Sequence, residues 1–316
     1  MTSLFQQTLI TYSPAFTLVP TYECFNRCSY CNFRTEPNQD LWLTRDEARK
    51  ILASLPGSGV TEILILSGEV HPSSTRRQDW LQLIYDLADL ALSMGFYPHS
   101  NVGPLSYEEM SLLKRVNVSM GLMLEQLTPK LLDTVHRHAP SKLPQLRLQQ
   151  LEWAGELQIP FTTGILLGIG ESMDDRISSL SAIARVHQKW HHIQEVILQP
   201  YSPGSQEKYL GENFSQTEML NTLTIARQIL PPSITIQVPP NLINNPQILL
   251  QCLELGATDL GGIVPKDEVN PDYHHHNIEK IREILFQQGW TLKPRLPVYP
   301  QYYPWLSHLQ KRINLI

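Results

Sequence analysis

Short apolar runs recur along the chain, and segments with helical periodicity separate them. The runs are almost continuously apolar, as expected for parallel strands that are covered on both faces. Eight of them are predicted to be strands: 16–20, 62–66, 97–101, 119–125, 161–166, 194–199, 234–238 and 259–263.

Helical signals fill the intervals between these runs. Thr44 with Glu47, and Ser106 with Glu109, have the spacing of a capping box, in which each side chain bonds the other residue's backbone amide. Three further segments carry an apolar stripe at helical spacing: 80–94, 178–190 and 218–230.

This alternation predicts an α/β protein, a single (β/α)8 barrel of the TIM type, with an open doubly wound sheet as the alternative. We expect one domain over 1–316, with a core of about 14–290 and an extended, proline- and aromatic-rich tail of about 291–316 that wraps over the body. Functional residues of such a barrel lie at the C-terminal ends of the strands.

Composition narrows the possible roles. Hydrophobic residues make up 42% of the 316 residues, which is enough for a large core. The net charge is −5 and the basic residues are dispersed, so a nucleic-acid surface is not indicated. The N-terminal residues lack a signal-peptide pattern, and no apolar run approaches the ~20 residues of a membrane span. We therefore expect a cytoplasmic protein without a membrane partner.

Three cysteines, Cys24, Cys28 and Cys31, follow the first strand with the spacing C-x3-C-x2-C. Cys252, the remaining cysteine, is distant, so no fourth local thiolate completes a tetrahedral zinc site. Three thiolates can hold three irons of a cubane cluster and leave the fourth iron open for chemistry. Zinc with a histidine as fourth ligand, and free thiols, stay open as alternatives, whereas a disulfide framework is not favoured.

Polar residues follow several other predicted strands. Ser67, Gly68 and Glu69 form a turn whose amides and carboxylate suit an ammonium group, the alternative being a tight turn with a solvent-facing Glu69. Glu125 ends the fourth strand and could also cap a helix. Arg147, about two turns into the next helical segment, could pair with Glu125, bind a ligand carboxylate or be an ordinary surface arginine.

A glycine-rich segment includes and follows the fifth strand. Gly164, Gly168 and Gly170 let the backbone approach a flat ligand such as adenine, and Glu171 follows them. The spacing is not that of a dinucleotide fingerprint. Asp174 and the adjacent Asp175 are expected to cap the next helix.

The histidines are weaker candidates. His274–His276 favour a solvated loop over a metal site. His191 and His192 are expected to interact with the dipole at the C-terminus of a helix. His136 and His138 lie near Lys142, in either an anionic-substrate rim or a plain basic loop.

The cysteine motif, with Tyr30 before its last cysteine, resembles that of the radical S-adenosylmethionine (SAM) superfamily. The resemblance implies a [4Fe–4S] cluster on the three cysteines and SAM on the open iron, cleaved to a 5′-deoxyadenosyl radical. It assigns SAM binding to Tyr30, to Ser67, Gly68 and Glu69 (amino group), to Glu125 and Arg147 (carboxylate and ribose), and to Gly164, Gly168 and Glu171 (adenosine).

From about residue 16 to about 271, the chain is also similar to the small-subunit (CofG-type) family of FO synthase. The segments that carry the similarity are 98–106, 119–125, 139–142, 159–171, 192–197, 238–242 and 259–262. The resemblance implies a radical SAM lyase that turns the 4-hydroxybenzyl–ribitylaminouracil adduct into 7,8-didemethyl-8-hydroxy-5-deazariboflavin, with ring closure and ammonia release. It further implies a partner enzyme that couples tyrosine to the diaminouracil, and a reductant such as flavodoxin or ferredoxin.

Position at strand ends makes four residues candidates for substrate contacts: Asn101, Gln199, Asn241 and Asp259. The chain departs from the family after the second and sixth strands, at 69–72 and 199–203, so contacts there are expected to differ.

Three rival functions stay open: the coupling partner of the same pathway, another radical enzyme of the biotin-synthase or hydrogenase-maturase kind, and a non-catalytic zinc-binding barrel.

Overall fold

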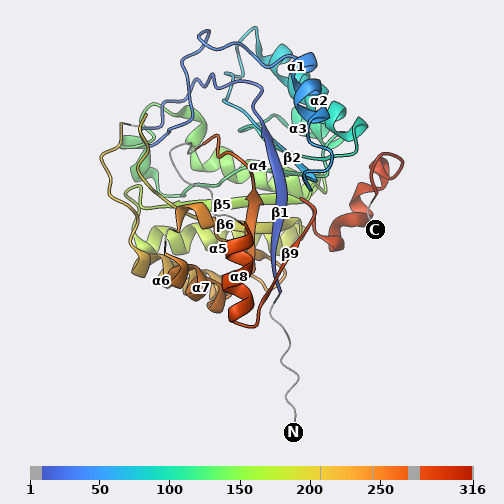
Figure 1. Cartoon of the computed structure of the whole chain (residues 1–316). Coiled ribbons are helices and arrows are strands. Elements are labelled where there is room, and N and C mark those ends of the chain that lie inside the picture. Colours follow the sequence, from blue (N-terminus) through green and yellow to red (C-terminus); the bar gives the residue numbers. More distant parts are fainter. Residues whose placement is uncertain (1–8, 207, 244, 270–277, 315–316) are drawn as a thin grey trace.

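A closed barrel of parallel strands forms the centre of the computed structural model, which describes residues 9–206, 208–243, 245–269 and 278–314. Helices surround the barrel (Figure 1). The barrel strands are β1 (Leu9–Leu18), β2 (Glu62–Leu66), β3 (Tyr97–Asn101), β4 (Ser119–Gly121), β5 (Phe161–Leu167), β6 (Ile193–Pro200), β7 (Thr235–Gln237) and β8 (Asp259–Ile263). Each strand pairs with the next, and β1 pairs with both β2 and β8, which closes the barrel. The (β/α)8 prediction is confirmed, and the open sheet is wrong.

Helices connect the strands and pack outside them. They are α1 (Arg45–Ala53), α2 (Arg77–Ser93), α3 (Tyr107–Lys114), α4 (Pro144–Glu156), α5 (Met173–Trp190), α6 (Gln216–Ile229), α7 (Pro246–Glu254) and α8 (Ile278–Gln287), with short 3-10 segments η1 (Pro129–Asp133), η2 (Pro140–Lys142) and η3 (Pro240–Leu242). The capping boxes of Thr44 and Ser106 are both present. Ser172, not an aspartate, caps α5, and Asp175 completes that capping box.

Two strands differ from their predicted bounds. The fourth ends at Gly121 instead of Glu125, because Glu125 has a φ of 64° and leaves the extended conformation. A single bridge to Ile165 is all that continues the pairing there. The first strand starts at Leu9, well before residue 16, because its first half pairs with a strand near the C-terminus that the sequence pattern did not reveal.

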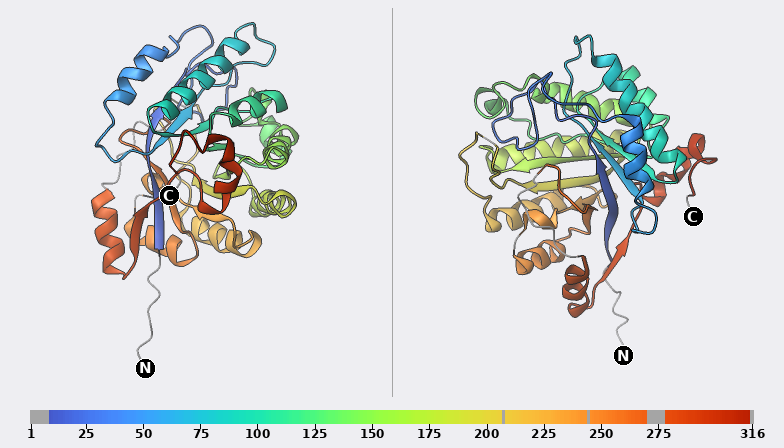
Figure 2. Two further views of the ribbon diagram at one scale, coloured as in Figure 1. Left: turned by 90° about the vertical axis from the view of Figure 1, so that its right-hand side faces the viewer. Right: turned by 45° about the horizontal axis from the view of Figure 1, so that its top comes forward.

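That partner is β9 (Thr291–Pro294), in the predicted extended tail. The tail does lie against the body, but it is not extended throughout, since Pro300–Leu309 form a 3-10 segment, η4, that buries Tyr302 and Leu306 in the core. Figure 2 shows this C-terminal part beside α2 and α3. Arg312 forms an ion pair with Asp89 of α2 at 2.9 Å.

Candidate active site

A cavity of about 440 Å³ runs through the barrel, a size typical of small-molecule sites. Tyr30 and Cys31, from the loop after β1, line one end, which we call the mouth. Arg295 and Pro297, from the C-terminal tail, line the other end, which we call the floor. The cavity therefore connects the cysteine motif with the C-terminal segment.

The side chains that line the cavity change in character along its length. Because alternate residues of a strand point inward, successive inward positions on one strand lie at different heights in the barrel. The floor is polar and is lined by Glu62, His99, Thr162, Glu195 and Gln237. Two residues further along their strands, Leu64 and Ile197 give an apolar middle, together with Leu122. Asn101 and Gln199 line the mouth side, where the sequence predicted them, as does Asn241, whose amide donates to Asp267 at 2.6 Å.

The cysteine loop, residues 24–31, is fixed by backbone hydrogen bonds to two other loops at the mouth. The amide of Phe25 donates to the carbonyl of Glu69 at 3.0 Å, and that of Arg27 to His138 at 2.7 Å. Ser29 bonds the segment after β4 in the same way, at 3.0 Å. The loop is thus held in place by main-chain contacts, which leaves its three thiols available as ligands.

The thiols lie in a buried environment. Burial, with the nearby charge of Glu69, raises the pKa of Cys24 to about 11, and burial raises that of Cys28 to about 12 despite the neighbouring Lys142. The neighbouring cysteines add to the raised pKa of Cys24 and of Cys28, and a bound cation would favour the thiolate of each. In the described part of the chain, no group of three or more Cys, His, Asp or Glu side chains is arranged to hold a single metal ion. Three thiolates that each bind a different iron fit this donor set.

Glu125 lies in a buried ionic cluster beside the cysteine loop. Lys142 Nζ donates to its Oε1 at 2.5 Å, and Arg147 Nη1 lies 3.7 Å away. Burial alone would raise the pKa of Glu125, but the charges of Lys142 and Arg147 outweigh it and lower that pKa. The left-handed backbone of Glu125 is a rare conformation for a non-glycine residue and typical of functional sites. Sequence reasoning found Glu125 but not Lys142 as its partner.

Arg147 belongs to this cluster, so the surface-arginine alternative is wrong. Because α4 begins at Pro144, Arg147 lies in its first turn and not two turns into the helix, and its side chain is 2% exposed. Its guanidinium donates to the carbonyl of Met123 at 2.5 Å and lies 3.6 Å from Glu69. Arg147 thus connects the loops after β2 and β4.

The turn after β2 is packed tightly against the cysteine loop. A Cβ atom on Gly68 would lie 2.1 Å from the carbonyl oxygen of Glu23, so only glycine fits. The Ser67 hydroxyl accepts from Trp80 Nε1 at 3.0 Å. Glu69 accepts from the amide of Asn26 at 2.8 Å, and its side chain is 12% exposed. The solvent-facing alternative for Glu69 is therefore wrong.

The glycine-rich turn after β5 is organised by Glu171. Its buried carboxylate accepts from the amides of Gly168 and Ile169 at 2.8 and 2.9 Å and pairs with Arg176 at 2.8 Å. Gly168 has a φ of 93°. Neither these glycines nor Glu171 line the cavity. Glu171 shapes the turn, and its side chain does not face the site.

Tyr30 and His136 pack together at the mouth. The Tyr30 hydroxyl and His136 Nε2 are 2.9 Å apart. Burial lowers the pKa of His136 to about 4, so it is neutral at physiological pH. Lys142 lines the cavity and His138 is exposed, which divides the predicted basic loop between site and surface.

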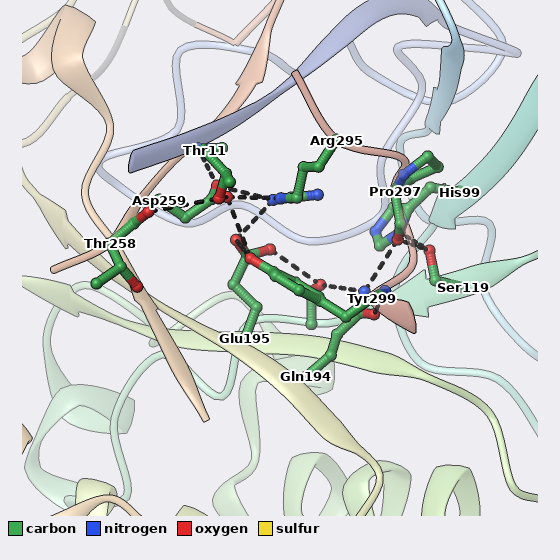
Figure 3. A network of polar contacts seen from close by, with 12 residues as sticks. Thr11, His99, Ser119, Gln194, Glu195, Thr258, Asp259, Arg295, Pro297 and Tyr299 are labelled. Atoms are coloured by element: carbon green, nitrogen blue, oxygen red, sulfur yellow. Dashed lines mark hydrogen bonds and ion pairs between the residues drawn. The ribbon is translucent and has the colours of Figure 1, made fainter. Parts of the chain in front are cut away.

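A second ionic network lies at the floor (Figure 3). Arg295 bonds Asp259 at 2.5 and 2.7 Å and Glu195 at 2.7 Å, and the Tyr299 hydroxyl donates to Asp259 at 3.1 Å. The predicted position of Asp259 at a strand end is wrong. It begins β8, is completely buried and pairs with Arg295, which lies 36 residues away in the tail. The Asp259 carboxylate holds Arg295, and Arg295 lines the floor of the cavity.

The two carboxyls of this network ionise differently. Burial raises the pKa of Glu195 to about 8. The negative charge of Asp259 acts in the same direction, and the positive charge of Arg295 opposes it. Burial alone would also raise the pKa of Asp259, but the charge and hydrogen bonds of Arg295 dominate and lower it. Of the two carboxyls, Glu195 therefore holds a proton more readily, and Asp259 is the ionised partner of Arg295.

The remaining histidine predictions have mixed outcomes. His191 ends α5 in a left-handed conformation. His192 is fully buried, and burial lowers its pKa to about 3, so a cation–dipole role for it is wrong. His274–His276 lie outside the described residues. None of the described helices is long and apolar enough to cross a membrane.

Comparison with known families gives one matching model and several close relatives. The Radical SAM superfamily model matches residues 18–183. Proteins named 7,8-didemethyl-8-hydroxy-5-deazariboflavin synthase from Nostoc sp. and Trichodesmium erythraeum are 64% and 60% identical, over 95% and 96% of this chain and 88% and 96% of the relatives.

Solved structures match in fold. The FeFe-hydrogenase maturase HydG from Carboxydothermus hydrogenoformans has a TM-score of 0.77 at 19% identity, covering 96% of this chain and 74% of that protein. Methylornithine synthase (PylB) has a TM-score of 0.68 at 15% identity, covering 92% and 85%. These likenesses concern the barrel and carry no substrate assignment.

Proposed function

The chain belongs to the Radical SAM superfamily and, within it, to the family of 7,8-didemethyl-8-hydroxy-5-deazariboflavin synthases, and from this premise we propose that it forms that deazaflavin. The observation that carries the proposal is the position of the cysteine loop in the wall of a cavity that runs the length of the barrel. A ligand on a cluster held by this loop would have access to the cavity, because Tyr30 and Cys31 line it.

Cys24, Cys28 and Cys31 are the proposed ligands of a [4Fe–4S] cluster, which the superfamily implies. When bound, the cluster and SAM supply a 5′-deoxyadenosyl radical that removes a hydrogen atom from the substrate. The protein's own contribution is to hold, orient and protect the reacting groups.

The charges at the mouth suit the methionine part of SAM. Glu69 and the backbone of its turn can accept the ammonium group, and Arg147 with Lys142 can donate to the carboxylate. Arg147 is 3.6 Å from Glu69 and 3.7 Å from Glu125, so its contacts with both acids are looser than a direct bond. A ligand carboxylate can therefore bind Arg147 Nη2, which lies 3.6 Å from Glu69, while Nε and Nη1 stay bonded to the carbonyls of Ser141 and Met123. The end of β5 at Leu166, which lines the cavity, is proposed to approach the adenosine, while Glu171 holds the turn at Gly168 in place.

The proposed reaction is that of a lyase. The adduct of a 4-hydroxybenzyl group with ribitylaminouracil gives one hydrogen atom to the 5′-deoxyadenosyl radical, closes its central ring, and loses ammonia, a proton and one electron. The barrel wall and the tail that closes the floor shield the reacting groups from water, which suits a radical reaction.

We further propose that a separate enzyme couples tyrosine to the diaminouracil to supply this adduct, that a flavodoxin or ferredoxin supplies electrons, and that the reaction takes place in the cytoplasm.

Anaerobic reconstitution of the full chain with iron and sulfide tests the function. We expect about four irons per chain. With SAM, dithionite and the adduct, we expect 5′-deoxyadenosine and the fluorescence of the deazaflavin. Consumption of tyrosine and the diaminouracil instead would identify the coupling enzyme. One tightly held zinc with no visible absorbance would overturn the radical function altogether.

A further inference from the structure

His99 has a fixed tautomer at the floor of the cavity. The hydroxyl of Ser119 lies 2.6 Å from the carbonyl oxygen of Pro297, which can only accept, so the hydroxyl donates to it. Ser119 Oγ is also 2.7 Å from His99 Nδ1, so Nδ1 carries the proton and donates to Oγ. This leaves Nε2 of the neutral imidazole with a lone pair and no proton. Figure 3 shows His99 beside Ser119 and Pro297.

The environment keeps His99 neutral. Burial lowers its pKa to about 3, and the charge of Arg295 acts in the same direction. Nε2 makes no hydrogen bond within the described part of the chain, and His99 lines the cavity. Gly121 has no side chain and so leaves room for the His99 ring: a Cβ atom on Gly121 would lie 2.8 Å from Nε2. A hydrogen-bond acceptor of fixed orientation is thus available to a ligand.

The floor around His99 offers both acceptors and donors. Glu62 and Glu195 contribute carboxyl groups, Gln237 an amide and Arg295 a guanidinium. The Glu62 carboxyl is 6% exposed, and burial raises its pKa. Above this level the cavity wall becomes apolar, at Leu64 and the other residues of the middle. The polar floor is thus a distinct part of the cavity, and it suits a ligand group that both donates and accepts hydrogen bonds along its length.

A chain of hydroxyl groups donates and accepts at every carbon, whereas the hydroxybenzyl ring carries a single hydroxyl group and the uracil ring has its donors and acceptors only at its edge. Within the proposed function, the rings of the substrate react with a radical that starts at the mouth, so they belong in the upper part of the cavity. The ribityl chain takes no part in the ring closure. We propose that the floor binds the ribityl chain and that His99 Nε2 accepts a hydrogen bond from one of its hydroxyl groups. This inference rests on the proposed function.

Two substitutions separate the roles of the two ring nitrogens. In His99→Asn, the amide nitrogen can replace Nδ1 toward Ser119, but the acceptor at the position of Nε2 is lost. In His99→Gln, the longer side chain reaches the position of Nε2 and can present its carbonyl oxygen there. If His99 serves only to hold Ser119 and the tail, His99→Asn is the milder change. If Nε2 binds the substrate, His99→Gln is the milder change.

The probes are the fluorescent product, 7,8-didemethyl-8-hydroxy-5-deazariboflavin, and an analogue with methyl in place of ribityl, titrated into the full cluster-loaded chain. We expect His99→Asn to weaken binding of the ribityl compound by about 3- to 10-fold, the loss of one hydrogen bond, and to leave binding of the methyl analogue unchanged. We expect His99→Gln to stay closer to the unsubstituted chain. Thermal melting of both variants monitors their folding.

The outcomes distinguish the inference from the function beneath it. Equal weakening of both compounds by His99→Asn, or no weakening of either, overturns the ribityl assignment while the function stands. An unsubstituted chain that binds neither compound and forms no deazaflavin from the adduct overturns both.

Discussion

The mouth and the floor of the barrel both hold buried ionic groups, but different parts of the chain build them. At the mouth, residues from the loops after β2 and β4 and from the first turn of α4 meet, and Arg147 lies 3.6 and 3.7 Å from its two carboxylates. At the floor, strand residues meet the C-terminal tail, and Arg295 lies within 2.7 Å of both its partners.

This difference separates a region whose arginine lies farther from its carboxylates from one whose arginine is bonded directly to them. Arg147 is held by the backbone carbonyls of Ser141 and Met123. Glu125 beside it has a left-handed backbone, as is common where a ligand completes the site. Arg295 is satisfied by Asp259 and Glu195 and fixes the tail across the barrel. We infer that chemistry starts at the mouth, whereas the floor stabilises the fold and positions the non-reacting end of the substrate.

The largest expected effect is at the mouth. Cys28→Ala removes one of three cluster ligands, so we expect loss of bound iron and of 5′-deoxyadenosine formation, by at least about 100-fold. Iron analysis and chromatography measure the two. Cys252→Ala is the matched control, because Cys252 is buried in α7, away from the site, and should leave both values unchanged. Retention of the full iron content in Cys28→Ala would contradict the assignment.

The second effect is at the floor and concerns stability. Arg295→Met leaves Asp259 and Glu195 buried without their cation, which should lower the free energy of unfolding by about 3–5 kcal/mol. Chemical denaturation measures it. Arg282→Met is the control, because its ion pair with Glu279 is exposed, and pairs of that kind contribute about 0–1 kcal/mol. Similar losses in both variants would show that the floor network is no stronger than a surface pair.

A third, smaller effect tests the turn after β2. Gly68→Ala forces a methyl group against the Glu23 carbonyl, an overpacking that costs about 1–3 kcal/mol and displaces the turn. We expect weaker SAM binding, by about tenfold, in equilibrium dialysis. Gly57→Ala is the control: it has a φ of 87° but no atom within 4 Å, so it should lose stability without losing SAM affinity. Equal SAM affinity in both variants would remove the turn from the site.

A fourth effect is a change of stability with pH. The pKa of Glu195 is about 8 in the folded chain against an ordinary 4.5, so between these values the folded state holds a proton that the unfolded state has lost. Glu195 therefore lowers stability as pH rises from about 5 to about 8. Glu195→Gln should lose less stability over that range, as measured by urea unfolding at several pH values. If the free energy of unfolding changed with pH equally in both proteins, Glu195 would not be the group that holds the extra proton.

Most of the mouth could be predicted from the sequence because its residues are local. The three cysteines lie within eight positions, and the turns at Ser67–Glu69 and Gly168–Glu171 directly follow apolar runs. Position after a strand was sufficient to bring them to one end of a barrel. It could not show that Glu171 turns inward to its own backbone, because this depends on the local path of the turn.

The floor was largely missed because its contacts are distant in the sequence. Arg295 meets Glu195 across 100 positions, and the tail around it gives no periodic signal. The alternation on β2 and β6, Glu62 to Leu64 and Glu195 to Ile197, does mark inward polar positions below an apolar level. It becomes informative only once the barrel defines which side is inward.

One measurement compares the two ends of the cavity directly: the amount of 5′-deoxyadenosine formed per deazaflavin in the adduct assay. The account predicts that Cys28→Ala abolishes both products, whereas His99→Asn still cleaves SAM but couples it poorly, so that the ratio rises. Loss of both products in parallel in His99→Asn, in a chain that retains its cluster and its fold, would contradict the division of the barrel into a mouth that starts the reaction and a floor that positions the substrate.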